Sequence, residues 1–318
     1  MSTKTDWSGI QREHADKAHT KEVSALRLQL DHAMAQIERM EKTKRAKIIA
    51  ATPARKRDSG DIVRIVVPDT HGAKVDKSAV ASMLSDITEL NPQEIVLLGD
   101  HVDCGGHLAL HHVMGYVAET PYSYEDDIAA ANSFLDSLRE AAPNARIDYI
   151  EGNHERRVET WCVTQTLRHQ HDSEGLRRLY APEYRLNLKE RDISYFRESV
   201  CYDGLSLPGV IKRGKCYFFH GFSTAKNATA ATVEKIAGNA VFGHTHRGQS
   251  TIMRKANVGV IGAWNPGCLC ELQPLWQHAN PTEWTHGYGI QLVHGDDFLH
   301  LNIPIIDGKS LFSSLFRL

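Results

Sequence analysis

Apolar residues between positions 20 and 42 recur at alternating spacings of three and four, which is the period of an amphipathic helix. The members of this apolar seam are Val23, Leu26, Leu30, Ala33, Ile37 and Met40. A seam of about three heptads is near the minimum for a coiled coil. We therefore expect this helix either to pair with a second copy of the chain, giving a homo-oligomer, or to lie on its own domain.

Beyond residue 60, short β-branched runs alternate with helical patterns. The runs at 62–67, from 94 onward and at 146–150 predict strands, and the segments 76–90 and about 124–141 predict helices between them. Strands that alternate with helices indicate βαβ units and a parallel sheet. After residue 210, closely spaced apolar runs predict a second, mostly β half, with strands at 216–219, 240–242, 257–262, 289–293 and 298–303.

The composition is that of a globular protein, with 42% hydrophobic and 24% charged residues in a chain of 318. These values exclude the disordered, collagen and fibrous classes for the bulk of the chain. No apolar run approaches the roughly 18 residues that cross a bilayer, and the polar N-terminus lacks the apolar stretch of a secretory signal. The six scattered cysteines are typical of reduced thiols. We expect a cytoplasmic protein with no membrane partner.

The net charge of −2 is unevenly distributed, because residues 42–57 carry seven Lys or Arg and no acid. This basic run continues to Ser59-Gly60 and predicts a linker, which is either a solvated tether or a contact for nucleic-acid phosphates. The chain then divides into a helix and basic linker at 1–60, one α/β domain at 61–308 and a tail at 309–318. The end of the tail, residues 311–318, is expected to pack on its own domain or to dock on a partner.

Five short polar motifs follow predicted strands, where α/β folds place their functional loops. In chain order they are Asp69-Thr70-His71-Gly72, Gly99-Asp100-His101-Val102-Asp103, Gly152-Asn153-His154-Glu155, His220-Gly221 and Gly243-His244-Thr245-His246. They supply Asp, Asn and His side chains, which suit Mn²⁺, Fe or Zn²⁺. No cysteine takes part, which argues against a structural thiolate zinc site. Each motif alone is commonly an accident or a helix cap, but the five in order predict a metal centre.

Through these motifs the chain resembles the calcineurin-like metallophosphoesterases over roughly residues 62–305. The resemblance implies a four-layer αββα sandwich that holds two divalent metals about 3.5–4 Å apart. It assigns Asp69, His71 and His246 to the first metal and Asn153, His220 and His244 to the second, with Asp100 as the bridge. Manganese is the first expectation, and Fe, Zn or Ni would accept the same ligands.

The resemblance also implies catalytic roles. A metal-bridging hydroxide would attack phosphorus in line, and His154 would protonate the leaving oxygen. Asp103 would accept a hydrogen bond from the other ring nitrogen of His154 and raise the pKa of the imidazole. The alternatives are a structural histidine at position 154 and a strand–helix cap at position 103.

Other polar residues near the motifs have two interpretations each. Arg156, Arg157 and Arg247 would either bind the phosphate of the substrate or form structural ion pairs. His101 is expected to be a bystander, and the histidines at 107, 111 and 112 either line the cleft or lie on an exposed helix face. The Asn265-Pro266-Gly267 turn is expected to support the site, and Asp296 and Asp297 to lie in a hairpin turn.

Departures from the family patterns bear on the substrate. Cys104 stands where the protein phosphatases and their relatives carry a phosphate-binding arginine, and the paired histidines of Gly243–His246 are similar to the phosphodiesterase, nuclease and nucleotide-hydrolase branches. Glu155 is instead typical of the protein phosphatases. We expect hydrolysis of phosphodiester bonds in nucleic acid or nucleotides. The alternatives are a phosphomonoesterase for phosphoproteins or small metabolites, and a binding scaffold without activity.

Overall fold

The structure is a computed structural model that describes residues 61–104, 123–166, 170–202, 204–274 and 281–316. The predicted helix at 20–42, the basic run at 42–57 and the histidines at 107, 111 and 112 lie outside the described residues.

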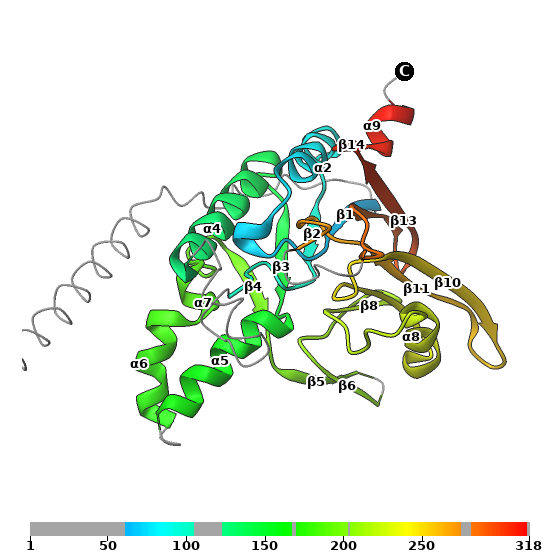
Figure 1. Cartoon of the computed structure of the whole chain (residues 1–318). Coiled ribbons are helices and arrows are strands. Elements are labelled where there is room, and N and C mark those ends of the chain that lie inside the picture. Colours follow the sequence, from blue (N-terminus) through cyan, green and yellow to red (C-terminus); the bar gives the residue numbers. More distant parts are fainter. Residues whose placement is uncertain (1–60, 105–122, 167–169, 203, 275–280, 317–318) are drawn as a thin grey trace, which may run out of the picture. The chain divides into compact units, whose positions relative to one another are not determined.

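The first sheet has seven strands in the order β14-β13-β12-β1-β2-β3-β4 (Figure 1). The strands are β1 (Asp61–Val67), β2 (Glu94–Leu97), β3 (Arg146–Ile150), β4 (Ile193–Phe196), β12 (Gly287–His294), β13 (Asp297–Ile306) and β14 (Lys309–Ser310). Strands β1 to β4 run parallel, which confirms the predicted parallel sheet. Strand β12 pairs antiparallel with β1, so β1 lies inside the sheet and residues from both ends of the domain meet there.

The second sheet has five strands in the order β10-β11-β9-β8-β7. These are β7 (Ile211–Arg213), β8 (Cys216–Phe219), β9 (Asn239–Phe242), β10 (Gly248–Lys255) and β11 (Gly259–Pro266). The strand predicted at 257–262 begins at Gly259 instead, because Asn257 adopts a left-handed φ of 65° in the turn of a hairpin with β10. Strand β10 was not predicted from the sequence. A separate hairpin joins β5 (Ser199–Tyr202) to β6 (Leu205–Pro208).

The two sheets pack face to face through a core that includes Val66 and Val96 from the first sheet and Phe218 and Val241 from the second. Helices cover the outer faces, with α2 (Lys77–Leu90), α4 (Tyr124–Ala141) and α5 (Asn153–Gln165) against the first sheet. Helix α8 (Ala228–Ile236) covers the second sheet. The described residues therefore form the four layers of an αββα sandwich, as predicted.

Local sequence explains where the main helices begin. The Asp76 side chain caps α2 by accepting hydrogen bonds from the backbone of Ser78 and Ala79, and Ser123 forms a capping box with Asp126 at the start of α4. The connection between β3 and β4 contains α5, α6 (Gln170–Tyr180) and α7 (Pro182–Arg185). No described helix is long and apolar enough to cross a membrane.

The C-terminal segment continues from β14 into α9 (Leu311–Phe316) and packs on its own domain. Phe312 contacts the core beneath the helices, and the backbone N–H of Ser310 donates to Ser82 Oγ at 2.7 Å. Asp296 and Asp297 lie at the turn between β12 and β13, where His294 pairs with Asp297. The described part of the tail, up to residue 316, packs on its own domain as predicted, and the hairpin position of the two aspartates is confirmed.

Candidate metal centre

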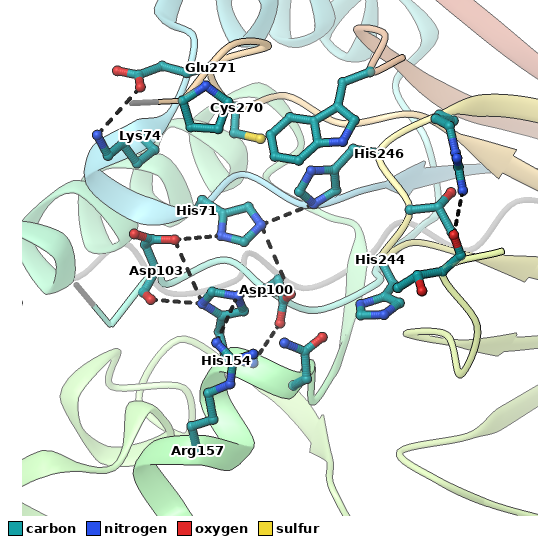
Figure 2. Close-up of a pocket in the computed structure, with 16 residues that line it drawn as sticks. His71, Lys74, Asp100, Asp103, His154, Arg157, His244, His246, Cys270 and Glu271 are labelled. Carbon is teal, nitrogen blue, oxygen red and sulfur yellow. Dashed lines mark hydrogen bonds and ion pairs between the residues drawn. The ribbon is translucent and has the colours of Figure 1, made fainter. Parts of the chain in front are cut away.

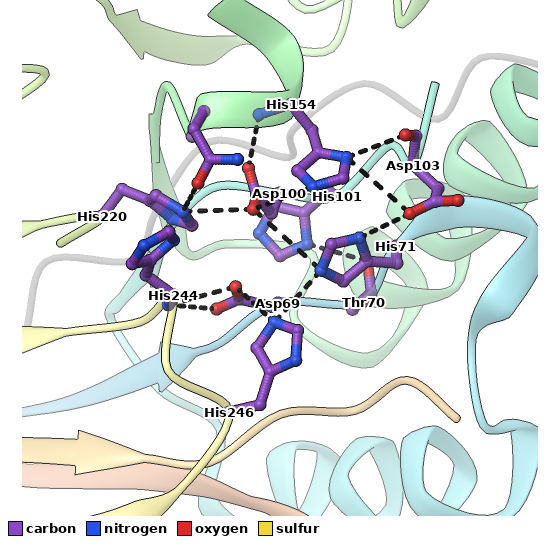
Figure 3. A network of polar contacts seen from close by, with 12 residues as sticks. Asp69, Thr70, His71, Asp100, His101, Asp103, His154, His220, His244 and His246 are labelled. Atoms are coloured by element: carbon purple, nitrogen blue, oxygen red, sulfur yellow. Dashed lines mark hydrogen bonds and ion pairs between the residues drawn. The ribbon is translucent and has the colours of Figure 1, made fainter. Parts of the chain in front are cut away.

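The five motifs meet at one edge of the two sheets (Figure 3). Asp69 and Asp100 follow β1 and β2, Asn153 begins α5 after β3, and His220 and His244 follow β8 and β9. Within each sheet these strands are parallel, so their carboxyl ends lie on the same side. The topology therefore gathers residues that are up to about 180 positions apart in the sequence.

The first group of candidate ligands surrounds Asp69. Its Oδ2 lies 3.0 Å from His246 Nε2, which in turn lies 3.1 Å from His71 Nε2. The ligand atoms of Asp69, His71 and Asp100 all lie within 4.8 Å of one another. Two imidazole nitrogens that face each other beside a carboxylate can direct their lone pairs at one cation.

The second group surrounds His220, whose Nε2 lies 2.9 Å from Asn153 Oδ1 and 3.1 Å from Asp100 Oδ2. The other ring nitrogen of His220 donates to the carbonyl of Leu98 at 2.9 Å, which fixes the ring with Nε2 directed at the site. The ligand atoms of Asp100, His220 and His244 lie within 4.8 Å of one another. Asp100 therefore belongs to both groups, the position that a bridging carboxylate requires.

The buried carboxylates make this edge strongly attractive to positive charge. Burial raises the pKa of Asp69, but His246 and His220 more than offset it and hold the pKa at about 2. For His71, burial lowers the pKa of the imidazole, but the Asp103 carboxylate raises it to about 10. Burial lowers the pKa of His220, and Asp100 raises it to about 9. Protons can supply the positive charge that this arrangement favours, and divalent cations can supply it as well.

The donor set fits two divalent cations. The seven candidate side chains offer two carboxylates, one amide oxygen and four imidazoles, which are ligands that Mn²⁺, Fe and Zn²⁺ accept. Two carboxylates, one of them shared, together with five neutral ligands hold two dications without excess negative charge.

Four of the seven candidate ligands have left-handed backbone conformations. The φ angles are 51° at His71, 53° at Asp100, 70° at His244 and 57° at His246. Such angles cost about 1–3 kcal/mol each in a residue with a side chain and persist only where the surroundings enforce them. Their concentration at this edge marks the loops as built to aim particular side chains.

Close approach of the backbone explains two of the glycines. A Cβ added at Gly152 would lie 2.1 Å from Asp100 Oδ1, and one added at Gly243 would lie 2.4 Å from Asp69 Oδ1. Real Cβ atoms essentially never lie this close to another atom. Glycine is therefore required at positions 152 and 243, where the backbone passes directly over a candidate ligand.

Two buried acids hold the ligand loops, and neither role was predicted from the sequence. Glu155 accepts hydrogen bonds from the backbone of Asp100, His101 and Gly152. Asp127 on α4 accepts from the backbone of Ala73, Asp103 and Cys104. The position of Glu155 inside the third motif was the only indication of such a role in the sequence. Nothing in the sequence pointed to Asp127.

Asn265 supports the last motif, as predicted. Its Nδ2 donates to the carbonyl of Gly243 at 2.6 Å and to Thr245 Oγ1 at 3.0 Å, and its Oδ1 accepts from the backbone of Gly267. The loop that carries His244 and His246 is therefore fastened to the end of β11.

His154 and Asp103 are neighbours, but the contact differs from the predicted one. His154 Nδ1 donates to the backbone carbonyl of Asp103 at 2.8 Å, whereas the Asp103 carboxylate lies 2.9 Å from His71 Nδ1 and 3.7 Å from His154 Nδ1. The backbone carbonyl of Asp103, rather than its carboxylate, is therefore the direct partner of His154. The predicted rise in the pKa of His154 is also wrong, because burial outweighs Asp100 and lowers the pKa to about 4.

The centre opens into a cavity of about 370 Å³ (Figure 2). Arg157 and Arg247 line this cavity, but Arg156 does not, because its Nε donates to Glu151 at 2.8 Å. Of the three predicted substrate-binding arginines, Arg156 therefore has the alternative role of a structural ion pair. Arg157 Nη1 lies 3.4 Å from His154 Nε2, whereas Arg247 is bound by the carbonyls of residues 224 and 225.

Three other residues lie beside the centre. His101 is buried, stacks on Phe134 and lies 2.9 Å from Thr70 Oγ1, which agrees with its expected bystander role. Cys104 is buried, so its thiol does not replace the missing arginine as a phosphate ligand. Cys270 was not predicted to be near the site, yet its sulfur lies within 4.8 Å of the ligand atoms of His71 and His246.

No protein-family model and no curated protein matches this sequence. Among solved structures, the chain is similar to a single mutant of Vps29 from Entamoeba histolytica, with 13% identity over 78% of this chain and 95% of that one and a TM-score of 0.38. It is also similar to YfcE, a phosphoesterase from E. coli, with 14% identity over 76% and 98% of the two chains and a TM-score of 0.31. The fold class rests on the strand order and layers above, and the chemistry rests on the residues of the centre.

Proposed function

We propose that this chain is a metal-dependent phosphoesterase of the calcineurin-like metallophosphoesterase kind. The observation that carries the proposal is the pair of ligand groups that share Asp100, next to His154 and Arg157 in one cavity. Asp69, His71 and His246 would hold one divalent cation, and Asn153, His220 and His244 the other. Bound dications lower the pKa of water and offset the charge of a phosphoryl group.

The residues of the chain supply position and proton transfer. The backbone N–H of His154 donates to Asp100 Oδ1 at 2.8 Å, which fixes the start of α5 against the centre. The bond from His154 Nδ1 to the Asp103 carbonyl leaves Nε2 facing the cavity. A phosphate anion beside Nε2 would favour the protonated ring, which can then give its proton to the leaving oxygen. Arg157, next to Nε2, would hold the same part of the substrate.

We propose a phosphodiester as the substrate, in a nucleic acid or a nucleotide. A monoester carries more negative charge than a diester, yet the position of the missing arginine holds the buried Cys104, and Arg247 is already engaged by two carbonyls. Of the other two described cations that line the cavity, Lys74 pairs with Glu271 at 3.5 Å, and Arg157 lies beside His154. The basic run at 42–57 would favour a polyanion, and polymer cleavage would then weaken steeply with salt. Pairing of two copies through residues 20–42 is part of the same proposal.

The deciding experiment compares bis-p-nitrophenyl phosphate with p-nitrophenyl phosphate after metal removal and addition of Mn²⁺. Faster diester hydrolysis, dependent on added metal, supports the proposal. Faster monoester hydrolysis would contradict the diester preference and favour a phosphatase. Failure to hydrolyse either compound with Mn²⁺, Fe²⁺, Zn²⁺ or Ni²⁺ would contradict the enzyme and favour a binding scaffold.

A further inference from the structure

Part of the cavity lining is an apolar wall, formed by Cys270, Pro274 and Trp284 beside the ion pair of Lys74 and Glu271. Cys270 and Pro274 are buried, and Trp284 is partly exposed. The Trp284 ring lies 4.1 Å from the His246 ring, centroid to centroid, at an angle of 77°. A large aromatic surface therefore directly adjoins a candidate ligand of the first cation.

The backbone beside Trp284 is firmly held. The N–H of Thr285 donates to the carbonyl of His246 at 2.9 Å, and the carbonyl of Thr285 accepts from the N–H of Cys268 at 2.9 Å. Thr285 Oγ1 also accepts from the N–H of Gly248. These bonds fix the Trp284 backbone relative to the ligand loop, so an aromatic contact made here would lose little entropy on binding.

Trp284 and His154 are separated by the candidate ligands. Ring contacts lead from His154 to His71 with a centroid distance of 4.6 Å, from His71 to His246 with 4.9 Å, and from His246 to Trp284. The leaving oxygen of a phosphodiester would lie at His154, beside Arg157. The ester group that stays on phosphorus must point elsewhere, and the apolar wall offers it a surface of matching chemistry.

We propose that Trp284 forms a subsite for a planar aromatic group on the retained side of the phosphodiester, a nucleoside being the biological example. This inference rests on the proposed function and narrows it to aryl and nucleoside diesters. Stacking on one aromatic side chain commonly changes binding about tenfold, and it tolerates different bases because each has a π-face.

The test uses two substrates with the same leaving group, p-nitrophenyl phenyl phosphate and p-nitrophenyl methyl phosphate. The kcat/KM of the phenyl diester is divided by that of the methyl diester, for the Mn²⁺-loaded wild-type protein and for Trp284→Leu. The intrinsic reactivities of the two substrates cancel when these two ratios are compared. The ratio should fall about tenfold in Trp284→Leu and persist in Trp284→Phe. Trp161→Leu is the matched control, because Trp161 contacts Tyr180 outside the cavity, and it should keep the ratio.

An unchanged ratio in an active Trp284→Leu protein would overturn the subsite. If wild-type protein hydrolyses neither diester, the proposed function fails, and the subsite is then judged by calorimetric binding of phenylphosphonate against methylphosphonate. A phenyl preference that Trp284→Leu abolishes supports the subsite without turnover. Equal affinities for the two phosphonates would overturn it.

Discussion

Replacing Asn265 by alanine tests how the loop of His244 and His246 is held at the metal centre. Asn265 is fully buried, and its amide joins three partners. Nδ2 donates to the Gly243 carbonyl and to Thr245 Oγ1, and Oδ1 accepts from the N–H of Gly267. Alanine removes all three bonds and leaves a small void next to two left-handed residues.

The expected loss of stability follows mainly from the Gly267 N–H, which is left without its partner in a buried setting. The Gly243 carbonyl loses one bond but still accepts from the N–H of Thr245 at 2.8 Å, and the Thr245 hydroxyl can rotate. An unpaired buried group costs about 1–3 kcal/mol and the loss of one further hydrogen bond about 0.5–1.5 kcal/mol, so the free energy of unfolding should fall by about 1.5–4.5 kcal/mol. In a domain of this size each kcal/mol lowers the midpoint of thermal unfolding by about 2–4 °C.

The metal centre should weaken as well, because the loop contributes one candidate ligand to each group. Urea unfolding gives the stability change, and calorimetric titration with Mn²⁺ at a temperature where the variant is folded gives the affinity of both sites. Asn227→Ala is the control, since the exposed Asn227 side chain makes no capping hydrogen bond at α8. That variant should stay within about 0.5 kcal/mol of wild type.

A loss below 1 kcal/mol with both affinities unchanged would refute this reasoning. A large stability loss with unchanged affinities would show that Asn265 supports the fold without positioning the two histidines.

Three further predictions concern single residues. His154→Asn should lower kcat about 10²- to 10⁴-fold while the protein still binds two metal ions, as measured by elemental analysis; unchanged turnover would contradict a role in proton transfer. Asp100→Asn should weaken both metal sites, because Asp100 lies in both groups, and full two-metal occupancy at the wild-type affinity would exclude the bridge. Burial lowers the pKa of His300 to about 4, below the value of 6.5 in an unfolded chain. The neutral, buried His300 side chain therefore makes its full contribution to the free energy of unfolding above pH 6.5, and this contribution is lost as the pH falls toward 4. The free energy of unfolding should therefore fall by about 2 kcal/mol between pH 7 and pH 5 because of His300, and urea unfolding of His300→Gln should show a correspondingly smaller pH dependence.

The convergence of the candidate ligands was predictable because it depends on sheet topology. Asp69 and Asp100 follow apolar runs that read as parallel strands, and parallel strands end at a common edge. Strand β10 escaped prediction because its residues alternate between exposed and half-buried positions and contain few large apolar side chains. Its identity as a strand depends on pairing with β11, which a local pattern does not contain.

The different roles of Arg156 and Arg157 follow from the residue at which helix α5 begins. Once α5 is known to begin at Asn153, residues 154 and 157 share a face because they are three positions apart. Arg157 then lies beside His154, while Arg156 projects toward Glu151. The partner of the Asp103 carboxylate was not predictable in this way, because His71 belongs to another loop, 32 residues away in the sequence, that meets Asp103 only in the folded chain.

The pairing of β1 with β12 has a consequence for synthesis of the chain. Ile65 pairs with Ile290, more than 200 residues later, so one edge of β1 stays open until almost the whole domain has left the ribosome. Open edges of apolar strands attract other chains. Chains ending before residue 287 would contain all seven candidate ligands and still lack the strand that closes this edge. We expect such fragments to aggregate, or to require a chaperone, however complete their metal-binding motifs are.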